Sequence, residues 1–191
     1  AWQVTLFMGL QSFLFYVTIT WLPEILIYGG LSTETSGWLL SFMLFIGLPA
    51  TFYTPIIASR VTNQKSIIIA IGLSAALGYG GLLLGGPMLL IIVSITLIGS
   101  ALGSSISLSL AFIGMRTRNG RQAAELSGMA QSFGYLLSAT GPMLIGLLFD
   151  ISNQWTIPLL ATLLIVGILI VFGLGAARDK YVFDDNLESN E

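Results

Sequence analysis

The sequence predicts an all-α membrane protein, built as a bundle of six transmembrane helices. Of the 191 residues, 55% are hydrophobic and 8% are charged, whereas an ordinary soluble domain has roughly 25% charged residues. Six apolar segments each come close to, or exceed, the ~20 residues that a helix needs to cross a bilayer. If these six segments cross the membrane in turn, every Lys and Arg residue falls on the same side of it.

Turn signals and charged residues set the bounds of the six spans. Gly85, Gly86 and Pro87 alone separate the third segment from the fourth. We divide the chain there because one helix over 66–115 would be far longer than a bilayer requires. The predicted spans are 1–22, 37–59, 66–84, 88–115, 126–149 and 156–176, which form one domain over residues 1–177, and an acidic tail follows over 178–191.

The distribution of basic residues predicts the orientation. They follow the second, fourth and sixth spans, as Arg60 and Lys65, then Arg116, Arg118 and Arg121, then Arg178 and Lys180. Because Lys and Arg collect in cytoplasmic loops, we expect both termini of this segment in the cytoplasm. The charged residues in the loops assigned to the outside are all acidic: Glu24, Glu34 and Asp150. A five-span alternative, with 66–115 as one helix, would split the basic residues between the two sides, and we reject it.

Small residues recur every four positions in the third and fourth spans, a pattern typical of membrane helices that pack closely. These two ridges are Gly72, Ala76 and Gly80, and then Gly99, Gly103, Ser107 and Ala111. We interpret them as the packing surfaces of a compact bundle.

Missing residue types narrow the possible functions. The chain has no cysteine and no histidine, which argues against thiol chemistry, His-containing metal sites and Ser/His catalysis. No charged residue lies in the middle of a span, which argues against a proton or ion relay within these helices. Glu24 is the nearest candidate for a coupling carboxylate, with an ordinary loop acid as the alternative. We therefore expect no catalytic residue, metal or cofactor, and no nucleic-acid partner.

Neutral polar residues are the candidates to contact a small ligand. Gln11 lies near mid-depth in the first span, and its amide could either read a small polar ligand or bond another helix. In the fifth span Gln131, Tyr135 and Ser138 follow at helical spacing on one face. The fourth span carries Ser100, Ser104 and Ser107 on one side and Ser105 and Ser109 on another. Packing would explain most of these serines, and Ser104 and Ser107 are retained as ligand candidates.

Prolines indicate where helices could bend. Pro49 and Pro55 interrupt the second span and Pro142 the fifth, and each removes a backbone hydrogen bond. We expect the second and fifth spans to be the moving parts of a gate, with a static kink as the alternative.

Six spans with both ends inside, and a short basic loop between the second and third, resemble the C-terminal half of a major facilitator superfamily transporter. The loop PIIASRVTNQK over 55–65 is similar to a degraded form of the superfamily signature G-x-x-x-D-R-x-G-R-R, with Arg60 and Lys65 as its basic residues. Pro55, Ser59 and Thr62 replace the first glycine, the acid and the second glycine. The segments WQVTLFMGLQSFLFYVTITWLPEIL and GMAQSFGYLLSATGPMLIGLLFD resemble the cyanate and nitroimidazole transporter branch more specifically.

This resemblance implies one half of a major facilitator fold in a bacterial inner membrane. It implies that the first and fourth spans line a central cavity and that the second and fifth meet an N-terminal six-helix half outside this chain. Gln11 and Ser12 would face the cavity, and the Gln131 and Tyr135 face would meet the cavity and the partner half. The solute would be a cyanate-like anion or a small heteroaromatic such as a nitroimidazole, moved by alternating access.

Three alternatives stay open beside this interpretation. One is a six-span transporter that pairs with itself, and another is a membrane scaffold that transports nothing. The third is an intramembrane enzyme, against which the absence of histidine and of mid-span acids argues.

Overall fold

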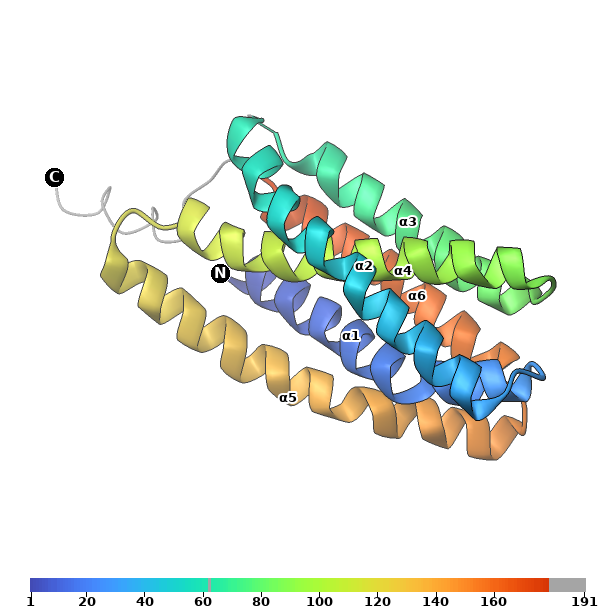
Figure 1. Cartoon of the computed structure of the whole chain (residues 1–191). Coiled ribbons are helices and arrows are strands. Elements are labelled where there is room, and N and C mark those ends of the chain that lie inside the picture. The colour runs from blue at the N-terminus through green and yellow to red at the C-terminus, as the bar shows by residue number, and fades with distance from the viewer. Residues whose placement is uncertain (62, 179–191) are drawn as a thin grey trace, which may run out of the picture.

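The computed structural model describes residues 1–61 and 63–178, and in this part of the chain it consists of six long helices joined by short turns (Figure 1). The helices are α1 (Trp2–Tyr28), α2 (Thr33–Arg60), α3 (Lys65–Leu84), α4 (Met88–Met115), α5 (Gly120–Ser152) and α6 (Thr156–Ala176). All six are long and apolar enough to cross a membrane. The predicted six-helix membrane bundle is confirmed. Apart from Arg178, the predicted acidic tail lies outside the described residues, as does Thr62 of the loop signature.

Three helices, α1, α2 and α5, extend beyond the predicted spans at the outer end, and α5 also begins earlier at the inner end, at Gly120. α1 continues through Pro23, where Leu22 and Leu26 are buried in the bundle. α2 begins at the cap residue Ser32, whose hydroxyl accepts the Thr35 N–H at 3.2 Å. The three acids that the sequence placed in outer loops, Glu24, Glu34 and Asp150, therefore lie within helix ends. These acids belong to helices rather than loops because an apolar run marks only the hydrocarbon depth, whereas a helix can continue into the headgroup region.

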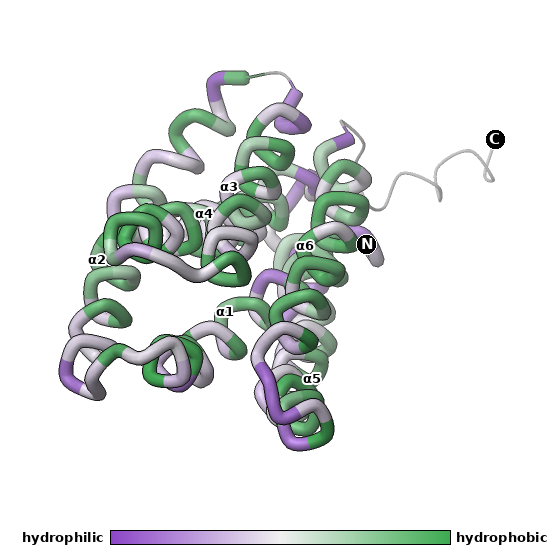
Figure 2. The backbone as a smooth tube through the Cα atoms, turned by 90° about the vertical axis from the view of Figure 1, so that its right-hand side faces the viewer, coloured by the Kyte–Doolittle hydropathy of each residue, from purple (hydrophilic) through white to green (hydrophobic). Residues whose placement is uncertain are grey.

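α1 lies in the middle of the bundle, packed mainly against α5 and α6 and also against α4 and α2. α2 packs chiefly on α4, and α3 packs on α4 and α6. Figure 2 shows that hydrophobic residues dominate along the helices and that α2 and α5 lie on the periphery. These two peripheral helices are among the least buried, so each exposes a long apolar face.

Glycine lets α2 and α4 touch backbone to backbone. A Cβ added at Gly103 would overlap the carbonyl oxygen of Gly47, and one added at Gly99 would overlap the carbonyl oxygen of Met43. The predicted small-residue ridge on α4 is thus a packing surface. On α3 the ridge is used in part, because Gly72 meets Ile170 of α6 whereas Gly80 faces open space.

Both ends of the described chain lie at the same end of the bundle, together with the α2–α3 and α4–α5 connections (Figure 1). All the described basic residues lie in these connections, in the helix ends beside them, or just after α6. The structure therefore gathers the positive charge at one end, as the sequence predicted, while the side of the membrane that this end occupies stays a prediction.

Candidate solute site

Gln11 and Ser12 of α1 and Tyr135 of α5 line one small cavity where α1, α4 and α5 meet. Its volume is about 130 Å³, and α4 contributes Ile106, Ser109 and Leu110 to its wall. Three of the six residues predicted to contact a ligand are thus brought together in a single cavity.

Gln11 is the polar centre of this cavity. The Gln11 side chain is 3% exposed and Ser12 is 4% exposed. The Gln11 Nε2 donates to the Ser12 Oγ at 2.8 Å, and the buried Gln11 Oε1 has no hydrogen-bond partner among the described residues. Leaving such an oxygen unpaired costs on the order of 1–3 kcal/mol. Within the same residues Gln11 makes no hydrogen bond to another helix, so it does not act there as a link between helices.

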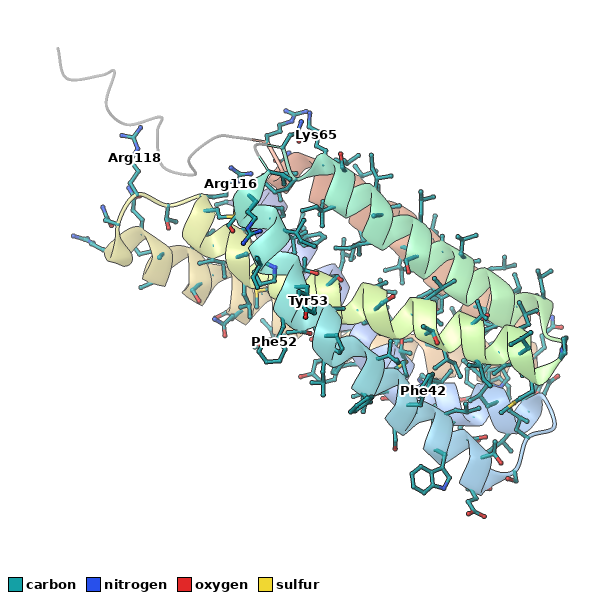
Figure 3. The ribbon with its side chains drawn as sticks, turned by 45° about the horizontal axis from the view of Figure 1, so that its top comes forward. Phe42, Phe52, Tyr53, Lys65, Arg116 and Arg118 are labelled. Atoms are coloured by element: carbon teal, nitrogen blue, oxygen red, sulfur yellow. The ribbon has the colours of Figure 1, made fainter. Side chains whose placement is uncertain are left out.

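Two tyrosines form the rim of the cavity. Tyr135 is 48% exposed and Tyr16 is 41% exposed, and both side chains line the opening. Phe15 and Ile106 are shared with an adjoining apolar cavity of about 210 Å³ between α1, α2 and α4. The two adjoining cavities form a recess with a polar end at Gln11 and an apolar end against Met43, Leu44 and Leu48 of α2. The aromatic side chains of α2 labelled in Figure 3, Phe42, Phe52 and Tyr53, lie outside both cavities and are exposed.

The other predicted ligand residues lie outside the Gln11 cavity. Gln131 is half-buried, and its Nε2 donates to Ser127 of the same helix at 2.6 Å. Ser104 accepts a hydrogen bond from Thr54 of α2 at 2.9 Å, and Ser107 bonds to carbonyls of its own helix. Their positions are a consequence of the rotation of α4 and α5 about their axes, which helical spacing alone does not fix.

Ser109 is the α4 serine that reaches the cavity, and sequence reasoning did not select it. Its hydroxyl donates to the carbonyl of Ile106 at 2.7 Å, and the residue is fully buried. The available signal was the second serine face of this helix, Ser105 and Ser109, but nothing in the spacing ranked one face above the other.

Comparison with known proteins finds bacterial transporters. The chain is 50% identical over 193 residues to the uncharacterized transporter YycB of Bacillus subtilis (strain 168). It is 39% identical over 183 residues to the 2-nitroimidazole transporter of Escherichia coli (strain K12) and 26% identical over 172 residues to the cyanate transport protein CynX of the same organism. These alignments cover 100%, 95% and 90% of this chain. The chain is homologous to these transporters. The predicted resemblance to the cyanate and nitroimidazole branch is confirmed.

The same alignments cover 47%, 46% and 44% of the three relatives. The chain thus spans about half the length of the curated relatives it matches, which agrees with the expectation of a half-transporter. No family model matches the chain. No solved structure matches it either.

The three prolines of this transporter homologue lie inside continuous helices, Pro49 and Pro55 in α2 and Pro142 in α5. The Trp21 indole N–H of α1 donates to the Pro142 carbonyl at 2.9 Å. The Trp21 ring also packs against Trp155, with ring centroids 5.5 Å apart. α1 and α5 are therefore joined at the proline position by a contact that sequence reasoning did not foresee.

Arg116 is a second residue whose role the sequence did not reveal, because it was read only as a topology signal. It is 3% exposed at the end of α4. Its Nε donates to the Ala176 carbonyl at 3.1 Å, and its Nη2 donates to the Ala177 carbonyl at 3.1 Å and to the Gln64 Oε1 at 2.8 Å. Arg116 thereby ties the ends of α4 and α6 to the α2–α3 connection. Arg60 and Lys65 of the loop signature are exposed instead.

Proposed function

We propose that this chain is the C-terminal six-helix half of a secondary transporter in a bacterial inner membrane, which moves a small solute by alternating access. The N-terminal half would cover the exposed faces of α2 and α5 and supply the other wall of the cavity. Both termini of this segment would be cytoplasmic. The protein would act by binding and releasing its solute rather than by catalysis.

The observation that carries the proposal is the buried, unpaired Gln11 Oε1 in a cavity with an aromatic rim. An unpaired acceptor in a low-dielectric site calls for a donor from a ligand or from water. We infer that Gln11 and Ser12 contact the polar edge of the solute and that Tyr135 packs against its face. Gln131, one turn before Tyr135, would contact the solute or the partner half in another conformation, whereas Ser104 and Ser107 would pack helices.

The solute would be a small heteroaromatic such as a nitroimidazole or a cyanate-like anion. The relatives carry names that point to both classes, a 2-nitroimidazole transporter and a cyanate transport protein. The residues lining the described cavity include no basic side chain, so an anion would need its countercharge from the other half. Tyrosine rings, by contrast, offer a stacking surface to a flat neutral ring. The cavity chemistry thus favours the heteroaromatic.

Movement between the two access states would use the proline positions. Pro49 and Pro55 weaken the backbone ladder of α2 and Pro142 weakens that of α5. We infer that these two helices bend during the transport cycle and that the bond from Trp21 to the Pro142 carbonyl forms in one state.

A flux assay tests the proposal. The full-length protein in liposomes should transport at least one member of a panel of azoles and small anions, measured with and without a pH gradient. Gln11→Ala should reduce that flux by about tenfold or more, because it removes a polar contact worth on the order of 1.4 kcal/mol or more. Gln154→Ala is the matched control, since Gln154 is an exposed glutamine in the α5–α6 turn and lies outside the cavity. Full flux in the Gln11 variant would contradict the site, and no flux for any solute would favour the scaffold.

A further inference from the structure

A second recess lies between α2 and α3 and shares no lining residue with the Gln11 cavity. α3 packs on α4 and α6 while α2 packs on α4, so the two helices diverge and α4 forms the floor between them. The resulting groove has a volume of about 500 Å³. Ile57 of α2 and Ala70 of α3 belong to opposite walls of this groove, and both are exposed.

The walls of this groove offer an apolar surface. Its buried and half-buried hydroxyls are already used, since Thr54 donates to Ser104 at 2.9 Å and Ser74 donates to the Leu97 carbonyl at 2.9 Å. Ser100 donates to the same Leu97 carbonyl at 3.0 Å. The hydroxyls deep in the groove are therefore already hydrogen-bonded within the bundle. A hydrocarbon chain, which needs no hydrogen bonds, is the ligand that fits such a surface.

Two basic residues adjoin one end of the groove in the chain. Val61 and Ser66 line it at this end, and their neighbours in the chain, Arg60 and Lys65, are both exposed. Lys65 projects from the start of α3 in Figure 3. Within residues 1–61 and 63–178 neither basic side chain forms a salt bridge.

The described acids lie elsewhere. Glu24, Glu34 and Asp150 are at the other end of the bundle. Glu125, on α5, pairs with Arg121 at 3.0 Å. In the described part of the chain, two exposed basic residues thus lie next in the chain to lining residues at one end of an apolar recess, with no acid beside them in sequence.

We propose that this groove binds an anionic phospholipid of the cytoplasmic leaflet, with one acyl chain between α2 and α3 and the phosphate at Arg60 and Lys65. Basic residues at the cytoplasmic surface attract anionic lipids, and a groove of this size lies within the range of small-molecule sites. The degraded loop signature would then have a role in this half: it would hold a lipid headgroup. This inference rests on the cytoplasmic orientation of the basic end and does not depend on the identity of the transported solute.

Native mass spectrometry of the full-length protein, released from vesicles of equal phosphatidylglycerol and phosphatidylethanolamine, tests the charge requirement. The wild type should retain phosphatidylglycerol in preference. The double variant Arg60→Gln/Lys65→Gln should lose that preference by about tenfold or more, because each basic residue near the surface is worth roughly fivefold. The charge-matched control is Arg118→Gln/Arg121→Gln, on residues of the α4–α5 connection and the start of α5, and this variant should keep the preference for phosphatidylglycerol.

A second variant tests the groove itself. Ala70→Trp should fill the recess and lower phosphatidylglycerol retention although both charges remain, whereas Leu164→Trp on the exposed face of α6 should not. Equal retention of the two lipids by the wild type, or unchanged retention in Arg60→Gln/Lys65→Gln, would overturn the proposal. So would displacement of the lipid by 2-nitroimidazole, which would assign the groove to the solute.

Discussion

Single residues decide whether the Gln11 cavity is a ligand site or a packing defect. A residue that stabilises the fold satisfies its hydrogen bonds inside the protein, whereas Gln11 leaves its buried Oε1 without a partner among the described residues. A binding site can keep such a group, because a ligand supplies the missing partner and the free protein tolerates the cost. Stability and function should therefore respond in opposite directions when Gln11 is replaced.

We predict that Gln11→Met preserves or raises the thermal stability of the full-length protein while it lowers solute binding by about tenfold or more. Methionine has a similar shape and fills gaps well, and it removes the unpaired oxygen. Thermal unfolding in detergent and equilibrium binding of the transported solute measure the two effects. If Gln11 instead bonded another helix, the variant would lose about 0.6–1.7 kcal/mol of stability, and that loss would count against the site.

Arg116 should behave in the opposite way, as a structural residue. Its buried guanidinium donates to two carbonyls of the α6 end and to Gln64. We predict that Arg116→Ala lowers the free energy of unfolding by about 2–4 kcal/mol, since hydrogen bonds from a charged donor contribute about 1.5–3 kcal/mol each and do not add fully. Arg121→Ala is the control, because its exposed pair with Glu125 should contribute at most about 1 kcal/mol. Equal losses of unfolding free energy in the two variants would show that Arg116 does not stabilise the ends of α4 and α6.

The sequence identified part of the cavity. α4 shows why it did not identify all of the lining residues. Gln11 and Tyr135 are predicted as polar residues in apolar spans and Ser12 by the family resemblance, and all three line the cavity. Ser109 lines it too, whereas the selected Ser104 turns toward α2. In a soluble helix the apolar stripe fixes which face is buried, but in a membrane helix every face is apolar and the rotation is set by packing.

At the scale of helices, the crossing of α2 and α4 depends on the absence of side chains. Gly47, Gly99 and Gly103 bring the two backbones into contact, where Thr51 of α2 also donates to the Gly103 carbonyl at 3.2 Å. This crossing sets the distance between the peripheral helix α2 and the cavity wall on α4. A wider crossing would therefore change both stability and the apolar recess.

We predict that Gly103→Ala lowers stability by about 1–3 kcal/mol, because the added methyl group overlaps the Gly47 carbonyl and the helices must separate. Gly114→Ala on the same helix meets open space and should be neutral or stabilising by up to about 1 kcal/mol, since alanine favours the helix over glycine. Thermal unfolding of the two variants side by side makes the comparison. A Gly103 variant as stable as the Gly114 variant would argue against the close crossing.

The six helices were predictable, and the exact ends of α1, α2 and α5 were not. Apolar length and the positions of Lys and Arg predicted six spans in the right order. The helix starts at Thr33 and Gly120 were missed, although Ser32 and Asn119 cap them and accept from the backbone N–H three residues on. Those capping residues were a readable signal, but the spans were bounded by hydropathy, which reports membrane depth rather than hydrogen bonding.

At the scale of the whole molecule, the described chain is a bundle with one basic end, an acidic opposite end and a recess toward two exposed helices. The charge asymmetry was predictable because it is a property of sequence order. The recess was not, because it arises from the way α1, α2, α4 and α5 pack around Phe15 and Ile106. The chain matches about half of each transporter relative, and in the proposed transporter a second half would cover the exposed faces.

The most direct test of the account is the accessibility of the cavity rim from the two sides of the membrane. This chain has no cysteine, so Tyr135→Cys places a single thiol in this half, at a position that is half-exposed and lines the cavity. In full-length protein without other reactive thiols, a membrane-impermeant reagent should label the introduced thiol from either side, and the transported solute should slow the labelling several-fold. Labelling from one side only, or at the same rate with and without solute, would contradict an alternating-access solute site at this cavity.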